Sequence, residues 1–177
     1  RINHNLNSSR AYYHNICTTH TFEQRVANIR MLQGLGFEIC SGGIIGMGES
    51  KEDVVDMLLE LREIQPEALP INFLLPIKGT PLGDADISGL TTEYCMKVLC
   101  LARLLVPKSD IRCAAGREVY FKGEKRNFSV SWILSLLPDI LLPAVRASRI
   151  PSKRSPMPDL LMKLNLHDFS YFSSDMK

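Results

Sequence analysis

Apolar positions along the chain follow two spacings, one typical of helices and one typical of buried strands. Helical spacing begins after Thr21, where the order Thr-Phe-Glu-Gln predicts a capping box, and it ends at Gly34 and Gly36. A second helix is expected to open at Ser50, and a third is expected over residues 92–105. The pattern therefore predicts three helices separated by other elements.

Continuous apolar runs lie before and between these helices and predict strands. The runs cover residues 37–45, 70–77 and 111–114, and residues 2–6 have the pattern of the end of a further strand. Strands that alternate with helices indicate parallel strands joined by crossover helices. The expected fold class is α/β, either a TIM-type (β/α)8 barrel or a doubly wound sheet. Four strands are about half of an eight-stranded barrel.

Composition and charge narrow the classes of function. Of 177 residues, 45% are hydrophobic and 23% are charged, which is ordinary for a globular protein. The formal net charge of +2 gives no argument for binding nucleic acid or an anionic membrane. Residues 132–145 come nearest to the ~20 apolar residues of a membrane span, but prolines and an aspartate interrupt them. The five cysteines lack close pairing, which favours a reducing cytoplasm over a disulfide framework.

The segment from Cys40 to Glu49, Cys-Ser-Gly-Gly-Ile-Ile-Gly-Met-Gly-Glu, places a thiol at the end of an apolar strand and just before several glycines. Glycines weaken a strand and mark places where a ligand or another backbone comes close. Both candidate folds hold their sites where strands end and helices begin. A cofactor at this segment is one hypothesis, and a buried cysteine acting as a small hydrophobe is the other.

Three asparagines alternate near the start of the chain. Asn3, Asn5 and Asn7 are expected to point to the same side of one strand. Three amides on one side are costly in a dry core unless they bind something. Either they meet a ligand, or the segment is a transition from strand to loop with solvated turns.

Two arginines are expected at unusual places. Arg25 lies in the first turn of a predicted helix, where a cation opposes the helix dipole. It either holds a substrate carboxylate or pairs at the surface with Glu23 or another acid. Arg112 lies within a predicted strand, and an arginine inside a barrel must be paired or ligated. An ion pair between Arg117 and Glu118 could lie beside it.

Other patterns carry less weight. The order Cys17-Thr-Thr-His20 has the look of half a metal site, but no second half with matching spacing exists, so a loop is expected there. Residues 78–81 form a turn that either meets a ligand or is only a turn. The sequence contains no zinc-protease motif, no P-loop and no dinucleotide-binding fingerprint.

Several segments, in order and in spacing, resemble the biotin synthase family of radical S-adenosylmethionine enzymes. They include Asn-His-Asn-Leu-Asn (3–7), Ile-Cys-Ser-Gly-Gly-Ile-Ile-Gly-Met-Gly-Glu (39–49), Pro-Ile-Asn-Phe-Leu (70–74) and Ile-Arg-Cys-Ala-Ala-Gly-Arg-Glu (111–118). Tyr-His-Asn-Ile-Cys-Thr-Thr-His-Thr-Phe (13–22) and Ile-Lys-Gly-Thr-Pro-Leu (77–82) also match. Separate motifs in register are a stronger signal than any one of them alone.

The resemblance implies a (β/α)8 barrel, of which residues 1–125 would form roughly the second half, about strands 4 to 7. It implies a [4Fe–4S] cluster, a [2Fe–2S] cluster and S-adenosylmethionine as cofactors. A 5′-deoxyadenosyl radical would take hydrogen from dethiobiotin, and sulfur from the [2Fe–2S] cluster would be inserted to form biotin. The implied protein is a cytoplasmic homodimer served by a reducing system such as flavodoxin or ferredoxin, with no nucleic acid or membrane partner.

Carried over position by position, the resemblance gives the candidate residues their roles. Cys40 and Arg112 would be ligands of the [2Fe–2S] cluster. The S-adenosylmethionine site would comprise Asn5, Asn7, Arg25, Ile44 and Leu75, with Arg25 on the methionyl carboxylate and Ile44 against the adenine. The dethiobiotin site would comprise Asn3, Asn5 and Asn72. No residue is assigned as catalytic with certainty.

The sequence also departs from the family pattern. It lacks the Cys-x-x-x-Cys-x-x-Cys loop that would hold the [4Fe–4S] cluster, and it opens inside an element without an initiator Met. We therefore expect a fragment that does not catalyse the reaction alone. The alternatives are an inactive truncated or pseudogene product and a related radical enzyme of the methylornithine synthase or hydrogenase-maturation type. The pair Cys40 and Arg112 argues against the related enzyme.

The resemblance ends near Lys125. Residues 126–177 are expected to be a divergent tail or the product of a frameshift. Moving the reading frame back by one nucleotide at Trp132 allows text like that of the family.

Overall fold

The structure, a computed structural model, describes residues 1–122, which lie within the first of two units of the chain, Arg1–Leu134 and Ser135–Lys177. The expected tail over residues 126–177 and its frameshift fall outside the described residues. In chain order the elements are β1 (Ile2–Asn3), η1 (Tyr13–Asn15), α1 (Phe22–Gly34), β2 (Ile39–Cys40), β3 (Gly43–Ile45), α2 (Lys51–Ile64), β4 (Ala68–Phe73), α3 (Thr92–Leu105), β5 (Asp110–Cys113) and α4 (Arg117–Tyr120).

The three long helices lie where the sequence predicts them, because local capping fixes where each begins. The Thr21 side chain accepts a hydrogen bond from the backbone N–H of Gln24, and the Gln24 side chain accepts from the N–H of Thr21. Ser50 and Asp53 make the same reciprocal pair at the start of α2. Thr91 caps α3, whose bounds match the predicted residues 92–105. Each cap satisfies N–H groups that the first turn leaves without a partner.

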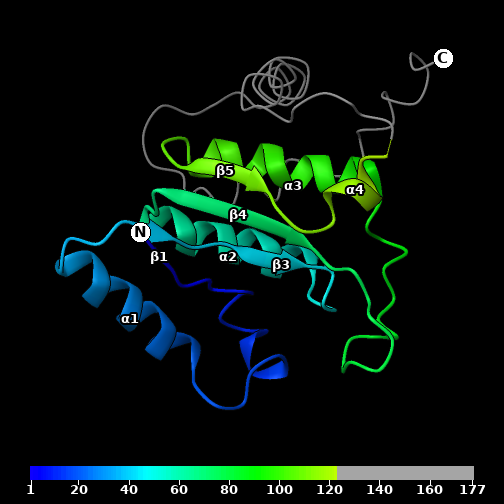
Figure 1. Cartoon of the computed structure of the whole chain (residues 1–177), viewed down its shortest axis with the longest axis horizontal. Coiled ribbons are helices and arrows are strands. Elements are labelled where there is room, and N and C mark those ends of the chain that lie inside the picture. The colour runs from blue at the N-terminus through cyan, green and yellow to red at the C-terminus, as the bar shows by residue number, and fades with distance from the viewer. Residues whose placement is uncertain (123–177) are drawn as a thin grey trace, which may run out of the picture. The chain divides into compact units, whose positions relative to one another are not determined.

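The strands form one parallel sheet, as the alternation of elements predicts. β1 pairs with β2, β4 pairs with β2 and β3 on one side, and β5 pairs with the other side of β4. All of these pairings are parallel. α1 joins β1 to β2, α2 joins β3 to β4, and α3 joins β4 to β5, whereas two residues alone separate β2 from β3. This mixed α/β order is consistent with part of a TIM-like fold. In Figure 1, β3, β4 and β5 lie in front of α2 and α3, so one face of the sheet turns toward the viewer.

The predicted strand over residues 37–45 is interrupted. β2 and β3 both pair with β4 in one register, but Ser41 and Gly42 between them belong to no strand. The N–H of Gly42 donates instead to the side-chain oxygen of Asn5, at 3.1 Å. Phe37 lies outside the strand and is 45% exposed. An amide side chain thus replaces a backbone acceptor at the break.

The prediction of a strand over residues 70–77 is wrong at both ends. β4 covers Ala68–Phe73, and the apolar residues that follow it leave the sheet. Leu75 is 38% exposed and Ile77 is 65% exposed. A run of apolar residues marks burial only while neighbouring strands continue beside it, and here β3 ends opposite Phe73. β5 begins one residue earlier and ends one residue earlier than predicted.

The core lies between the sheet and its helices. Alternate strand residues are buried on this side: Ile39, Ile45, Leu69, Ile71, Phe73 and Ile111. From α2, five side chains are buried: Val54, Met57, Leu58, Leu61 and Ile64. Gly43 allows α2 to come close, because a Cβ there would lie 2.1 Å from Met57 Sδ. Among the described residues, no helix combines the length and the apolar character needed to cross a bilayer.

Candidate functional site

The face of the sheet opposite this core carries polar side chains from four strands, and we call it the open face. Asn3, Cys40, Ala68 and Asp110 share one register row. Two residues further along, Arg112 pairs with Pro70, and Ile44 pairs with Asn72 in a row beyond. Residues in one row of a parallel sheet point to the same side. The structure therefore brings Asn3, Cys40, Ile44, Asn72 and Arg112, all expected from the sequence, onto one face.

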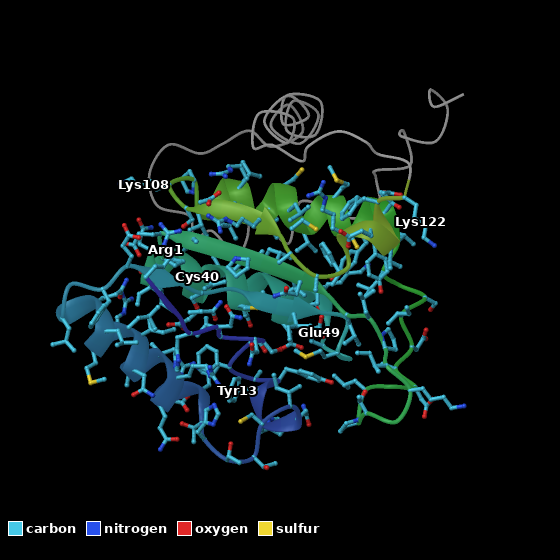
Figure 2. All side chains as sticks on the ribbon, viewed as in Figure 1. Arg1, Tyr13, Cys40, Glu49, Lys108 and Lys122 are labelled. Atoms are coloured by element: carbon cyan, nitrogen blue, oxygen red, sulfur yellow. The ribbon has the colours of Figure 1, made fainter. Side chains whose placement is uncertain are left out.

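The Cys40 thiol lies on this face near the start of the strands. Figure 2 shows Cys40 there, with Glu49 beyond the carboxyl end of β3. The side-chain amide of Asn3 approaches the Cys40 sulfur at 3.7 Å, and the thiol is half-buried. Cys40 is thus no fully buried small hydrophobe, and its sulfur is available from the open face.

Arg112 has a partner that the sequence did not predict. Its Nε donates to Asp110 at 2.7 Å, and Nη2 donates to the same carboxylate oxygen. The hydrogen bond and charge of Asp110 raise the pKa of Arg112, and the charge of Cys40 raises it further. The pairing uses residues two apart on one strand, a spacing that puts both on the same face. Nη1 is free of Asp110.

Asn72 ties two parts of the site together. Its Nδ2 donates to the carbonyl of Gly43 at 3.1 Å, and its Oδ1 accepts from the N–H of Ala115 at 3.1 Å. The side chain therefore holds β3 and the segment after β5 in place, with one N–H left over. Leu75 and the turn at residues 78–81 lie in the segment that follows β4, with Leu75 partly exposed.

The sequence predicted that Asn3, Asn5 and Asn7 point to the same side of one strand. In the structure, β1 ends at Asn3, and Asn5 and Asn7 lie beyond it. Asn7 has a φ of 72°, in the left-handed region that asparagine tolerates better than most residues. Its carbonyl accepts from the N–H of Ile44 at 2.9 Å. The Asn5 amide oxygen is used by Gly42, as described above. These amides complete the strand pairing where the backbone leaves gaps, which replaces the expectation of solvated turns.

The turn after β3 is fixed from two sides. The carboxylate of Glu49 accepts from the N–H groups of Gly46, at 2.6 Å, and Met47, at 2.8 Å. The Tyr12 hydroxyl donates to the Met47 carbonyl at 3.0 Å. Gly46 and Gly48 have φ values of 102° and 107°, which L side chains rarely adopt. Glu49 therefore acts on the backbone of the turn, and the turn presents a preformed edge beside Ile44.

Arg25 does not pair with Glu23, because Glu23 forms an ion pair with Arg10. The guanidinium of Arg25 donates to the Tyr13 hydroxyl at 2.8 Å, the Asn5 carbonyl at 3.0 Å and His20 Nε2 at 2.7 Å. These bonds use one N–H of each nitrogen. Within residues 1–122, one N–H on each terminal nitrogen and the positive charge are left without a protein partner. Two such N–H groups are what a carboxylate binds with two oxygens.

Sequence analysis missed a cluster beside Arg25. Cys17 Sγ lies 3.4 Å from His20 Nδ1 and 3.5 Å from Thr19 Oγ1, in the loop expected to carry no chemistry. The Cys-x-x-His spacing just before a helix cap was the available signal. The Thr19 hydroxyl above all lowers the pKa of the Cys17 thiol to about 7.

The described residues do not contain a complete set of metal ligands. Within residues 1–122, no group of three or more His, Cys, Asp or Glu side chains could hold a metal ion. Cys40 supplies one thiolate, the ligand type that iron–sulfur clusters require. The thiol of Cys40 fits one ligand position of such a cluster.

Comparisons with known proteins agree with the resemblance. The Radical SAM superfamily model matches residues 1–61, and the Biotin and Thiamin Synthesis associated domain model matches residues 70–131. A curated protein named biotin synthase from Thermus thermophilus is 50% identical over 119 residues, 67% of this chain and 36% of the relative. One from a Sulfurihydrogenibium species is 47% identical over 122 residues, 69% of this chain and 36% of the relative. The chain thus spans about a third of the length of these relatives.

Proposed function

Because the chain belongs to the biotin synthase family, we propose that it serves the reaction of that family, the insertion of sulfur into dethiobiotin to form biotin. The observation that carries the proposal is the open face, where four strands gather Asn3, Cys40, Asn72 and Arg112. When bound, S-adenosylmethionine with a [4Fe–4S] cluster supplies a carbon radical, and a [2Fe–2S] cluster supplies sulfur. The protein's task is to place these groups and exclude water.

S-adenosylmethionine would bind at the carboxyl end of β3. The two unused N–H groups of Arg25 suit its methionyl carboxylate, since no carboxylate among residues 1–122 neutralises this guanidinium. The turn held by Glu49 offers backbone groups to the adenine, and Ile44 offers an apolar surface. Asn5, Asn7 and Leu75 would complete the site. The backbone carbonyl of Asn5 accepts a hydrogen bond from Arg25, so the positions of these two residues depend on each other.

Dethiobiotin would lie over the open face, between Asn3, Asn5 and Asn72. Asn3 and Asn5 each have one protein partner, Cys40 Sγ and the Gly42 N–H, and Asn72 has two, the Gly43 carbonyl and the Ala115 N–H. A side-chain amide has two donors and an acceptor with two lone pairs, so each keeps capacity for a polar ligand. Their positions are therefore fixed before the ligand arrives.

The [2Fe–2S] cluster would be held by Cys40 and Arg112, with other thiolates from outside this sequence, because residues 123–177 contain no cysteine. Asp110 binds the Nε and Nη2 side of Arg112 and leaves Nη1 for another partner. The ligands of the [4Fe–4S] cluster would also come from outside this sequence, which contains no Cys-x-x-x-Cys-x-x-Cys loop. The proposal includes a reducing partner of the flavodoxin or ferredoxin type, a homodimer and a cytoplasmic location.

The first test compares two cysteines on opposite faces of the sheet. Cys113 shares a row with Ile71 and Gly43 on the core side, whereas Cys40 lies on the open face. The test is made on a longer protein in which this chain is joined to a segment that carries the Cys-x-x-x-Cys-x-x-Cys loop. After anaerobic reconstitution of that protein with iron and sulfide, Cys40→Ser should lose the [2Fe–2S] absorbance, and Cys113→Ser should keep it. Biotin formation from dethiobiotin should follow the same order. Retention of both clusters and of activity in Cys40→Ser would remove Cys40 as a ligand.

A second test addresses Arg25. Arg25→Lys keeps a positive charge but loses the two-pronged donor, so binding of S-adenosylmethionine should weaken about tenfold or more by equilibrium dialysis. Arg30→Lys is the matched control, because Arg30 donates only to Gln33 and to carbonyls near the end of α2. Equal affinities in both variants would place the carboxylate elsewhere.

A further inference from the structure

The loop before α1 gathers a thiol, a hydroxyl and an imidazole that the proposed reaction does not use. Cys17 Sγ lies 3.5 Å from Thr19 Oγ1 and 3.4 Å from His20 Nδ1. Thr19 Oγ1 in turn lies 3.0 Å from His20 Nδ1. Tyr13, from η1, contacts His20 Nε2 through its hydroxyl at 2.9 Å. Figure 2 places Tyr13 in this region, below the sheet.

The surrounding bonds decide which ring nitrogen of His20 carries the proton. Arg25 Nη2 lies 2.7 Å from His20 Nε2, and a guanidinium can only donate. Nε2 must therefore be the acceptor, and the proton of the neutral ring lies on Nδ1. Nδ1–H then bonds to the Thr19 hydroxyl at 3.0 Å, and the Cys17 sulfur lies beside the ring, 3.4 Å from Nδ1 and 3.6 Å from Nε2. Arg25 thus fixes the imidazole beside the sulfur without touching the sulfur itself.

The thiols of the described residues differ sharply. The hydrogen bond from Thr19 is the main cause that lowers the pKa of Cys17 from 9.0 to about 7, with backbone and Tyr13 bonds adding to it. Burial raises the pKa of Cys95 to about 12 and those of Cys100 and Cys113 to about 11. Cys17 is also partly exposed, whereas Cys95 and Cys100 are buried. Cys17 combines access with donors that stabilise a thiolate.

We propose that Cys17 is a modification site for peroxides, activated by Thr19 and His20. The sulfur gives an electron pair to one peroxide oxygen, so an S–O bond forms and the O–O bond breaks. Hydroxide leaves and takes a proton from solvent to become water. The sulfur loses two electrons to become a sulfenic acid, and the peroxide gains them. The Thr19 hydroxyl and His20 Nδ1–H lie beside the sulfur, where they can bond to the leaving oxygen.

The expected rate advantage is moderate. At pH 7 a thiol with a pKa near 7 is about half ionised, against about 1% for a thiol with a pKa of 9. The lower basicity reduces the reactivity of each thiolate by roughly tenfold. Together these effects give about a fivefold advantage before the donors act on the leaving oxygen. The site does not depend on the proposed biotin synthase reaction.

The test uses the purified protein without added iron, treated with hydrogen peroxide in the presence of dimedone. Mass spectrometry should find the sulfenic acid adduct at Cys17 at least about fivefold faster than at Cys40, which is also half-buried. His20→Gln should slow the Cys17 adduct about threefold or more, whereas His14→Gln, an exposed histidine of η1, should not.

Two outcomes would overturn the proposal. One is an adduct that forms at Cys40 as fast as at Cys17. The other is a Cys17 rate in His20→Gln that equals the unaltered rate while circular dichroism shows both proteins folded alike. Because neither measurement involves S-adenosylmethionine or biotin, a failure of the proposed enzymatic function leaves this test intact.

Discussion

The two faces of the same four strands are built on different principles. On the core side, most alternate strand residues are buried aliphatic or aromatic ones, with Gly43 and the half-buried Cys113 as exceptions, and α2 packs against this side through five buried side chains. On the open face, the corresponding positions hold Asn3, Cys40, Asn72, Asp110 and Arg112. Since strand residues alternate between faces, one short sequence carries both patterns.

The difference separates residues that hold the fold from residues that are free to serve chemistry. A side chain on the core side loses packing energy when it is shortened, because its neighbours cannot fill the space. Side chains on the open face are tied mainly by hydrogen bonds to backbone groups, as with Asn5 and Asn72. The strands can therefore keep their register while the open face changes.

Cysteine reactivity should show the largest contrast between packed and polar surroundings. Burial raises the pKa of Cys113 to about 11, whereas bonds from Thr19 and its neighbours lower that of Cys17 to about 7. Iodoacetamide should alkylate Cys17 with a rate that rises between about pH 6 and 8 and then levels off. Cys113 should react about a hundredfold more slowly at pH 7, because its thiolate is scarce though intrinsically more reactive, and its rate should keep rising up to about pH 11.

Peptide mass spectrometry across a pH series measures both rates in one sample. Thr19→Val removes the main cause of the lowered pKa, so the Cys17 profile should move to higher pH. Superimposable profiles for the two cysteines would show that the packed side gives Cys113 no protection.

Truncation of isoleucine on each face compares packing directly. Ile71 is fully buried on the core side, and Ile71→Ala should lower the free energy of unfolding by about 2–5 kcal/mol. Ile44, half-buried on the open face, should lose about 1 kcal/mol or less on the same change. Urea titration of the two variants gives the difference. Equal losses would mean that Ile44 is packed as tightly as Ile71, and that the two faces do not differ in packing.

The comparison also explains how much the sequence predicted. Helix ends were predicted well because Thr21 and Ser50 cap through residues only three positions away. Strand ends were not, because apolar residues such as Ile77 continue beyond the sheet, and only the neighbouring strand decides where pairing stops. The shared face of Cys40 and Arg112 came from family resemblance, and the register between strands puts both there.

Partners over long distances were the part that sequence patterns could not supply. Arg25 was weighed against Glu23, two residues away, yet its contacts are Asn5, Tyr13 and His20. Their approach depends on where the first strand lies against the start of α1, which no local spacing encodes. The Cys17 cluster was missed for a similar reason, since the orientation of the His20 ring depends on the hydrogen bond from Arg25.

Substitution of two adjacent glycines, Gly42 and Gly43, should lower the free energy of unfolding by less than truncation of Ile71 does. A Cβ on Gly42 would lie 1.8 Å from the Pro70 carbonyl oxygen, and one on Gly43 would lie 2.1 Å from Met57 Sδ. Backbone cannot move aside as the end of a methionine can. Gly42→Ala should therefore cost about 2 kcal/mol and Gly43→Ala about 1 kcal/mol, measured by urea unfolding. The reverse order would show that packing on α2 limits the sheet more than strand spacing does.

The smallest effect is expected for Asp110→Asn on the open face. The side chain of Asp110 is 50% exposed and that of Arg112 is 56% exposed, so solvent screens their ion pair. The loss in unfolding free energy should stay below about 0.5 kcal/mol and vanish at high salt. Glu38→Gln, which removes the exposed pair with Arg1, is a control of the same kind. A loss above about 1.5 kcal/mol for Asp110→Asn would mean that Asp110 and Arg112 help to hold the strands. The open face would then belong to the fold as much as the core side does, and the division between the two faces would fail at the residue proposed to meet the cluster.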